Sequence, residues 1–175
     1  VLEIGTNRYT RTFGGDRVTH SEVLHVANPG PEVTMLGDLT TAEHIAAECF
    51  DCIILTQTLN AIFDVPAALH TCFRILKPGG VLLVTIPGIS KISRYDMERW
   101  GYFWSFTSAS ARRLVTEAGF PENQVEVAAH GNVLAAIAFL HGLAWEELKR
   151  HELDAQDPDF ELLITVRAMK AETTS

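Results

Sequence analysis

The 175-residue sequence lacks an apolar run long enough to cross a membrane. An uncharged, mostly apolar stretch runs from Val133 to Trp145, shorter than the ~20 residues that a spanning helix needs. A basic start followed by an apolar run and a small-residue cleavage site is also missing, so we expect a cytoplasmic protein without a membrane span. The first residue is Val1 rather than Met, inside a predicted strand, and we expect the natural chain to begin further upstream.

Cysteine is scarce, and the three thiols are Cys49, Cys52 and Cys72. A small, odd number favours a reducing compartment over a disulfide framework. Cys49 and Cys52 have the spacing of a redox pair, but they lead into a strand and not into the helix N-terminus that such a pair needs. His70 and Cys72, two residues apart on a predicted helix, point to different faces and do not complete a zinc site. We therefore expect plain buried thiols and no metal.

Basic residues are also few. Lys and Arg total 14 against 22 Asp and Glu, which gives a net charge of −8. The excess lies in residues 117–175, with 11 acids and 4 bases, whereas residues 1–116 carry 11 and 10. A protein that binds nucleic acid needs a cationic face to offset phosphates, so this balance argues against a nucleic-acid partner. It is typical of a solvated acidic surface.

What the sequence does contain is an alternation of strand-like and helix-like segments. Short apolar or β-branched runs predict strands at residues 1–4, 18–26, 33–36, 50–56, 81–86, 125–129 and 161–168. Between them, helical spacing or capping signals predict helices at 41–48, from Asp64 to about 76, at 108–118 and over most of 133–153. This order predicts an α/β fold, a Rossmann-like, doubly wound and mostly parallel sheet. Ligands of such sheets bind at the carboxyl ends of the strands.

Polar residues follow several of these predicted strands. Glu3 and Gly5 lie at the end of the first strand. In dinucleotide-binding folds, an acid ~20 residues after such a glycine holds a ribose diol, and Glu22 lies close to that spacing from Gly5. Asp38 follows the third strand and Gln57 the fourth. A carboxylate at the end of a strand either contacts a ligand or caps the next helix, and both alternatives remain open for Asp38.

Four motifs together resemble the class I S-adenosylmethionine-dependent methyltransferases, in particular a type 11-like methyltransferase domain that is truncated at its N-terminus. They read VLEIG at 1–5, GDL at 37–39, FDCIIL at 50–55 and RILKPGGVLL at 74–83. The resemblance implies one methyltransferase domain over residues 1–175 with a seven-stranded sheet. Its last strand would be antiparallel beside the fifth, and residues 131–158 would be a helical insertion between the last two strands.

The resemblance also implies S-adenosylmethionine as cofactor and assigns its contacts to strand ends. The methionine part would lie at Glu3, Gly5 and Asn7, the ribose at Glu22, the adenine at Asp38 and Leu39, and the sulfonium end near Gln57. Asn7 and Tyr9 stand where the family usually has glycines. That departure motivates an alternative, a non-catalytic fold that has lost the cofactor.

The segment at residues 93–107 mixes aromatic and charged side chains, which suits a pocket for a ring or a sugar. The candidates for substrate binding are Arg94, Tyr95, Arg99, Trp100 and Trp104. Asp96, and His130 at the end of the sixth predicted strand, are the candidate bases. The competing interpretations are that the aromatics pack the loop onto the sheet and that His130 is structural.

Taken with these residues, the resemblance implies methyl transfer to a small-molecule or glycan-type acceptor, at oxygen. A nicotinamide-dependent oxidoreductase is the more distant alternative, because the chain lacks the G-x-G-x-x-G turn that holds a pyrophosphate. The apolar stretch from Val133 to Trp145 predicts a buried helix, a lid or the surface of a homodimer.

Overall fold

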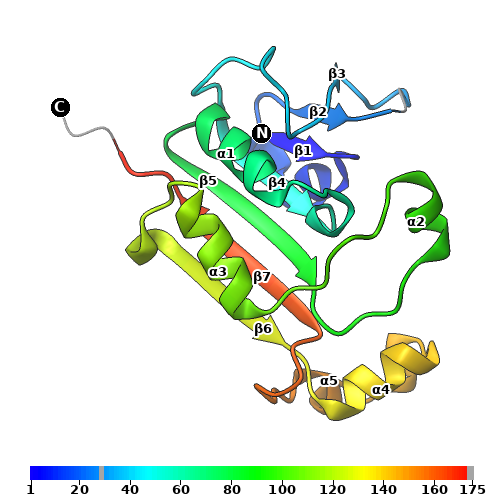
Figure 1. Ribbon diagram of the computed structural model, residues 1–175. Coiled ribbons are helices and arrows are strands. Elements are labelled where there is room, and N and C mark those ends of the chain that lie inside the picture. The colour runs from blue at the N-terminus through cyan, green and yellow to red at the C-terminus, as the bar shows by residue number, and fades with distance from the viewer. Residues whose placement is uncertain (28–29, 173–175) are drawn as a thin grey trace.

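The computed structural model describes residues 1–27 and 30–172. It contains a seven-stranded sheet in the order β3-β2-β1-β4-β5-β7-β6 (Figure 1). The strands are β1 (Leu2–Ile4), β2 (Glu22–His25), β3 (Met35–Leu36), β4 (Phe50–Thr56), β5 (Leu76–Pro87), β6 (Val125–His130) and β7 (Leu163–Met169). The first five run parallel, and β7 lies antiparallel between β5 and β6. The predicted Rossmann-like fold with an antiparallel last strand is confirmed.

Two helices, α1 (Val65–Ile75) and α3 (Ser108–Glu117), pack side by side on one face of the sheet (Figure 1). Asp64 caps α1 by accepting a hydrogen bond from the Ala67 amide at 3.0 Å, and Thr107 and Ser110 form a capping box at the start of α3. Leu69 of α1 and Val115 of α3 are buried against central strands of the sheet. Burying such a side chain contributes about 1.5–3 kcal/mol.

The other helical segments are short. They are η1 (Thr10–Gly14), η2 (Gly15–Arg17), η3 (Leu59–Ala61), α2 (Arg94–Arg99), η4 (Glu122–Gln124), α4 (Val133–His141), η5 (Trp145–Glu147) and α5 (Arg150–Asp154). The α4–α5 excursion lies between β6 and β7 and extends beyond the end of the sheet (Figure 1). Several apolar side chains of α4 are exposed, among them Ile137 and Leu140, and the predicted homodimer would depend on them. No helix of the described ranges is long and apolar enough to cross a membrane.

The helix predicted at 41–48 is wrong, because this stretch forms a succession of turns. The Arg74 guanidinium donates to the carbonyl of Ala42 at 2.7 Å and to that of Ile45 at 2.6 Å. Those acceptors are therefore satisfied by a side chain from α1, and a continuous helix is not needed to pair them. Tertiary contact here overrides the local helical preference.

The second strand is shorter than predicted and begins at Glu22 rather than at residue 18. Its register is set by β1, because the Glu22 amide donates to the Val1 carbonyl at 2.9 Å and Leu2 pairs with Glu22. Residues before Glu22 belong to the connection through η1 and η2. The carboxyl end of β2 is therefore His25, three residues beyond Glu22.

Candidate functional site

A cavity of about 600 Å³ lies where four parallel strands end, and we call it the strand-end cavity. Its wall comes from the ends of β1 and β2, the turns that follow β3 and β4, the segment from η3 to Asp64, and the end of α2. The volume lies within the ~300–1,000 Å³ typical of sites for small molecules. It also lies at the edge of the sheet where ligands of doubly wound folds bind.

Gly5 lines the first part of this wall, whereas Glu3, a predicted cofactor contact, does not line the cavity and instead holds the turn that follows Gly5. The Glu3 side chain is 1% exposed, and its carboxylate accepts hydrogen bonds from the Tyr9 amide at 3.0 Å, the Thr10 amide at 2.8 Å and the Thr10 hydroxyl at 2.7 Å. These bonds fold the turn after β1 back onto the strand. Gly5 lines the cavity with a φ of +86°, a conformation that side chains with a Cβ rarely adopt.

Glu22, predicted to hold a ribose, is not brought to the strand-end cavity. It starts β2, and its carboxylate pairs with the exposed His20 ring at 2.7 Å. The residue that β2 brings to the cavity is His25, whose Nδ1 accepts from the Ala27 amide at 3.0 Å. The spacing from Gly5 led to the prediction of Glu22, whereas the pairing of β2 with β1 places His25 at the carboxyl end of β2.

Asp38, Leu39 and Gln57 all line the strand-end cavity. Asp38 Oδ1 accepts from the amide and the hydroxyl of Thr40, each at 2.8 Å, so the carboxylate is held in a tight turn after β3. Gln57 follows β4 with a φ of +50°, and its amide donates to the Thr85 carbonyl at 2.8 Å. A residue other than glycine at positive φ is uncommon, and such strain concentrates at functional sites.

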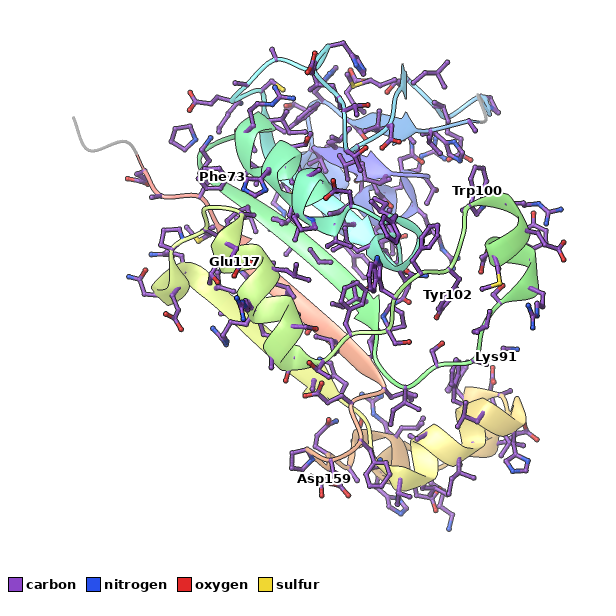
Figure 2. All side chains as sticks on the ribbon, viewed as in Figure 1. Phe73, Lys91, Trp100, Tyr102, Glu117 and Asp159 are labelled. Carbon is purple, nitrogen blue, oxygen red and sulfur yellow. The ribbon has the colours of Figure 1, made fainter. Side chains whose placement is uncertain are left out.

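The aromatic segment contributes part of what was predicted for substrate binding. Arg99 and Trp100 line the strand-end cavity. Trp104 holds the segment in place instead, because its indole Nε1 donates to the carbonyls of Ile62 and Phe63 at 3.0 and 3.2 Å. Arg94 and Tyr95 lie outside the cavity. The Tyr95 ring nevertheless contacts a cavity residue, because the Arg99 guanidinium lies over it, with Cζ 3.5 Å from the ring centroid. Figure 2 shows Trp100 and Tyr102 on the chain that returns from α2.

Neither predicted base lies in the strand-end cavity. Asp96 is in the first turn of α2, and His130 ends β6 with its Nε2 at 3.1 Å from the Thr165 hydroxyl. A carboxylate that does line the cavity is Asp64. The sequence predicts Asp64 only as the cap of α1. Its position in the segment between the fourth strand and α1, close to η3, is the feature that places it at the cavity.

Asn7 has a buried side-chain oxygen, Oδ1, without a hydrogen-bond partner among the described residues. Such an atom costs free energy unless a ligand or water satisfies it. It belongs to the turn that Glu3 holds in place, two residues after Gly5. Asn7, a predicted cofactor contact, is not among the residues that line the strand-end cavity.

A second, larger cavity of about 810 Å³ lies over the sheet face between η1 and β6, and we call it the open-face cavity. Its wall is mostly the faces of strands, with Ile54, Leu83 and Val127 among its residues. Its charged pair, Arg167 and Glu126, is already joined at 3.0 Å. Because it lies across the strands rather than at their carboxyl ends, the strand-end cavity is the better candidate despite its smaller volume.

A family model described as a methyltransferase domain matches residues 13–123, more than half of the chain. The chain belongs to this methyltransferase family. The match covers β2 to η4 and so includes the residues of the strand-end cavity from Leu24 to Trp100. Ile4 and Gly5 precede it. A comparison with curated proteins gives no match.

Solved structures show that the methyltransferase has the class I fold. One neighbour is an S-adenosylmethionine-dependent methyltransferase from Archaeoglobus fulgidus, with a TM-score of 0.64 and 10% identity over 97% of this chain and 85% of that one. Another, from Mesorhizobium loti, has a TM-score of 0.62 and 17% identity over 97% and 90%. Haemonchus contortus phosphoethanolamine N-methyltransferase 2, solved with S-adenosyl-L-methionine, has a TM-score of 0.58 and 17% identity over 98% of this chain and 48% of that one.

The cysteines of the methyltransferase do not form a metal centre or a redox pair in the described parts of the chain. No group of three or more His, Cys, Asp or Glu side chains is arranged there to hold a metal ion. The exposed Cys49 thiol donates to the Ala46 carbonyl at 3.1 Å, and Cys72 is fully buried in α1. Burial raises the pKa of all three thiols, and that of Cys72 to about 12. The expectation of buried thiols is right for Cys72 and wrong for Cys49, which is exposed.

We expect the thiols to react in an order set by this burial. A thiolate is the reacting species, and its fraction grows as pH rises towards the pKa. At pH 8 Cys49 should be alkylated first, whereas Cys72 should react at least about a hundredfold more slowly in the folded protein. Mass spectrometry of timed iodoacetamide reactions measures the order, and urea should abolish it. Equal alkylation rates for Cys49 and Cys72 without urea would contradict the buried position of the Cys72 side chain in α1.

Proposed function

We propose that the methyltransferase binds S-adenosylmethionine in the strand-end cavity and transfers its methyl group to a hydroxyl of a small-molecule or glycan-type acceptor. The observation that carries the proposal is the convergence of backbone turns and polar side chains on this one cavity. Gly5, Asp38 and Gln57 come from three strand ends that are far apart in the sequence. A bound nucleoside with an amino-acid tail needs contacts of this spread and variety.

The residues present fit this cofactor. The Gly5 turn leaves the backbone open to a ligand, since a Cβ built at Gly5 would meet no atom within 4 Å. The Asp38 carboxylate suits the adenine amino group, and Leu39 offers an apolar surface to the ring. His25 replaces Glu22 in the proposed ribose subsite. When bound, S-adenosylmethionine supplies a methyl group already activated on a sulfonium.

The acceptor side is proposed to lie between η3 and α2. Phe63 and Trp100 present aromatic surfaces there, and Arg99 presents a cation. Rings stack on such surfaces, and a guanidinium binds a carboxylate or phosphate in a fixed geometry. Since the methyl group arrives activated, these side chains have mainly to position the acceptor for in-line attack.

A hydroxyl acceptor must lose its proton as the methyl bond forms, and Asp64 is the proposed recipient. Asp38 and Asp64 are the two carboxylates that line the strand-end cavity among the described residues. Asp38 lies at the turn after β3, whereas Asp64 lies beside Phe63 on the acceptor side. Solved neighbours with a named acceptor include a phosphoethanolamine N-methyltransferase. Their acceptors belong to those proteins, and the proposal for oxygen depends on Asp64.

The variant Asp64→Asn tests this role with little risk to the fold. Asparagine caps a helix as well as aspartate does, so α1 keeps its N-cap, but the amide cannot take up a proton. We expect turnover to fall about a hundredfold or more, with the Kd for S-adenosylhomocysteine unchanged within about threefold. The readout is formation of S-adenosylhomocysteine with hydroxylated aromatic and sugar acceptors, with amine acceptors in parallel. Full activity of Asp64→Asn would contradict a proton-accepting role.

Binding of the cofactor tests the proposal itself. Calorimetric titration with S-adenosylmethionine and S-adenosylhomocysteine should give micromolar Kd values, and NAD should give no binding. Asp38→Ala should weaken binding about tenfold, the worth of one good hydrogen bond to a charged group. No binding of either compound would favour the alternative of a non-catalytic fold, which Asn7 and Tyr9 in the turn motivate.

A further inference from the structure

The α2 segment lies beside the strand-end cavity and makes few contacts with the rest of the protein. No residue of α2 is buried, although its last residue, Arg99, and the following Trp100 line the cavity. The hydrogen bonds described for residues 93–100 close within that segment, for example from the Trp100 amide to the Asp96 carbonyl at 2.8 Å. A helix of six residues with no buried side chain has little stability of its own.

The chain becomes firmly attached only beyond Gly101. The Phe103 amide donates to the Asn60 carbonyl at 2.8 Å, and the Phe106 amide donates to the Pro87 carbonyl at 2.9 Å. Gly101 has a φ of +87°, and a Cβ on it would lie 2.4 Å from the Phe103 ring. Gly101 therefore reverses the chain between the attached part and α2, at a position that another residue would strain.

A contact between two rings joins the end of α2 to the sheet. The rings of His25 and Trp100 meet edge to face, with centroids 5.3 Å apart and an interplanar angle of 74°. The bond from the Ala27 amide to His25 Nδ1 fixes the orientation of the imidazole. Both rings line the strand-end cavity, one from β2 and the other from the residue that follows α2. Trp100 is 37% exposed, so the indole lies between the cavity and the solvent only in part.

We propose that His25 and Trp100 act as positioning residues that hold the end of α2, with Arg99, against the strand-end cavity, so that this pair sets the residence time of the bound nucleoside. The inference rests on the proposed function. An aromatic pair of this geometry is worth more than the area it buries. Breaking it releases the end of α2, and the bound ligand then leaves faster, while ligand entry changes little.

The test is the dissociation rate of S-adenosylhomocysteine, measured by stopped-flow displacement for the single variants His25→Ala and Trp100→Ala and for the double variant. Trp100→Ala should raise the rate about tenfold, and His25→Ala at least as much, because it also removes the proposed ribose contact. Because both changes break the same ring contact, the double variant should match His25→Ala rather than show the product of the two single effects. Trp100→Phe keeps a ring at the position and should stay within about threefold of the unmodified chain.

Trp145→Ala is the matched control, since it removes an exposed tryptophan, 71% exposed, from η5 and should leave the dissociation rate unchanged. Single effects that multiply in the double variant, or single effects below twofold, would overturn the inference while leaving the cofactor site intact. Absence of any binding by the unmodified chain would overturn the proposed function, and this inference with it.

Discussion

Replacing Glu3 by glutamine should lower the free energy of unfolding by about 3 kcal/mol and weaken S-adenosylhomocysteine binding more than tenfold. The buried carboxylate accepts three hydrogen bonds from Tyr9 and Thr10, and a charged acceptor contributes about 1.5–3 kcal/mol per bond. Glutamine keeps one oxygen and turns an NH₂ group towards amide donors. The turn that follows Gly5 then loses the bonds that hold it, and Gly5 lines the strand-end cavity.

Urea unfolding followed by circular dichroism measures the first effect, and calorimetry the second. Glu126→Gln is the control, because that carboxylate is exposed and its pair with Arg167 is a surface ion pair, worth about 0–1 kcal/mol. A Glu3→Gln protein as stable as the Glu126→Gln control would show that the turn does not depend on the carboxylate. Lost stability with intact binding would separate Glu3 from the cofactor site.

Gly88→Ala should destabilise the protein by about 2–3 kcal/mol through overpacking. A Cβ on Gly88 would lie 2.0 Å from the Glu161 carbonyl oxygen, a backbone atom that cannot swing away. The two segments of the chain are also joined there, because the Ile89 amide donates to the same carbonyl at 2.8 Å. The Glu161 side chain in turn accepts from the amide and the hydroxyl of Ser108, so the strain reaches the start of α3.

The comparison for Gly88→Ala is Gly30→Ala, because a Cβ on Gly30 would meet nothing within 4 Å. We expect that change to stay within about 0.5 kcal/mol of the unmodified chain. Thermal and urea unfolding of both variants measure the difference. Equal stability of the two variants would contradict the close approach of residues 88 and 161, and with it the position of the chain that leads to α2.

Much of the fold can be read from local sequence. Asp64 followed by Pro66 predicted the start of α1, and KPGG at 77–80 predicted that the helix ends there, since capping and turn residues act on their immediate neighbours. The strand predicted at 81–86 begins earlier, because β5 starts at Leu76 and includes KPGG. The order of strands followed from the resemblance to a known family. Helix caps and turn residues of this kind do not depend on partners that are distant in the sequence.

The candidate site was harder to predict because tertiary contacts decide it. Asp38, Leu39 and Gln57 follow strands whose ends were recognised, and they line the strand-end cavity. Glu22 was chosen by spacing, but pairing with β1 starts the strand there and leaves His25 at its end. Likewise, the turns at 41–48 depend on Arg74, more than 25 residues away in the sequence.

The most direct test of the account is to locate the bound cofactor on the ¹H–¹⁵N NMR spectrum of the protein. On addition of S-adenosylhomocysteine, we expect signals to shift at the strand-end cavity, at Gly5, His25, Asp38, Leu39, Gln57 and the Trp100 indole. Signals of the open-face cavity, such as Phe13 and Leu83, should not move. Shifts confined to the open-face cavity, or none at millimolar ligand, would contradict the assignment of the cofactor site.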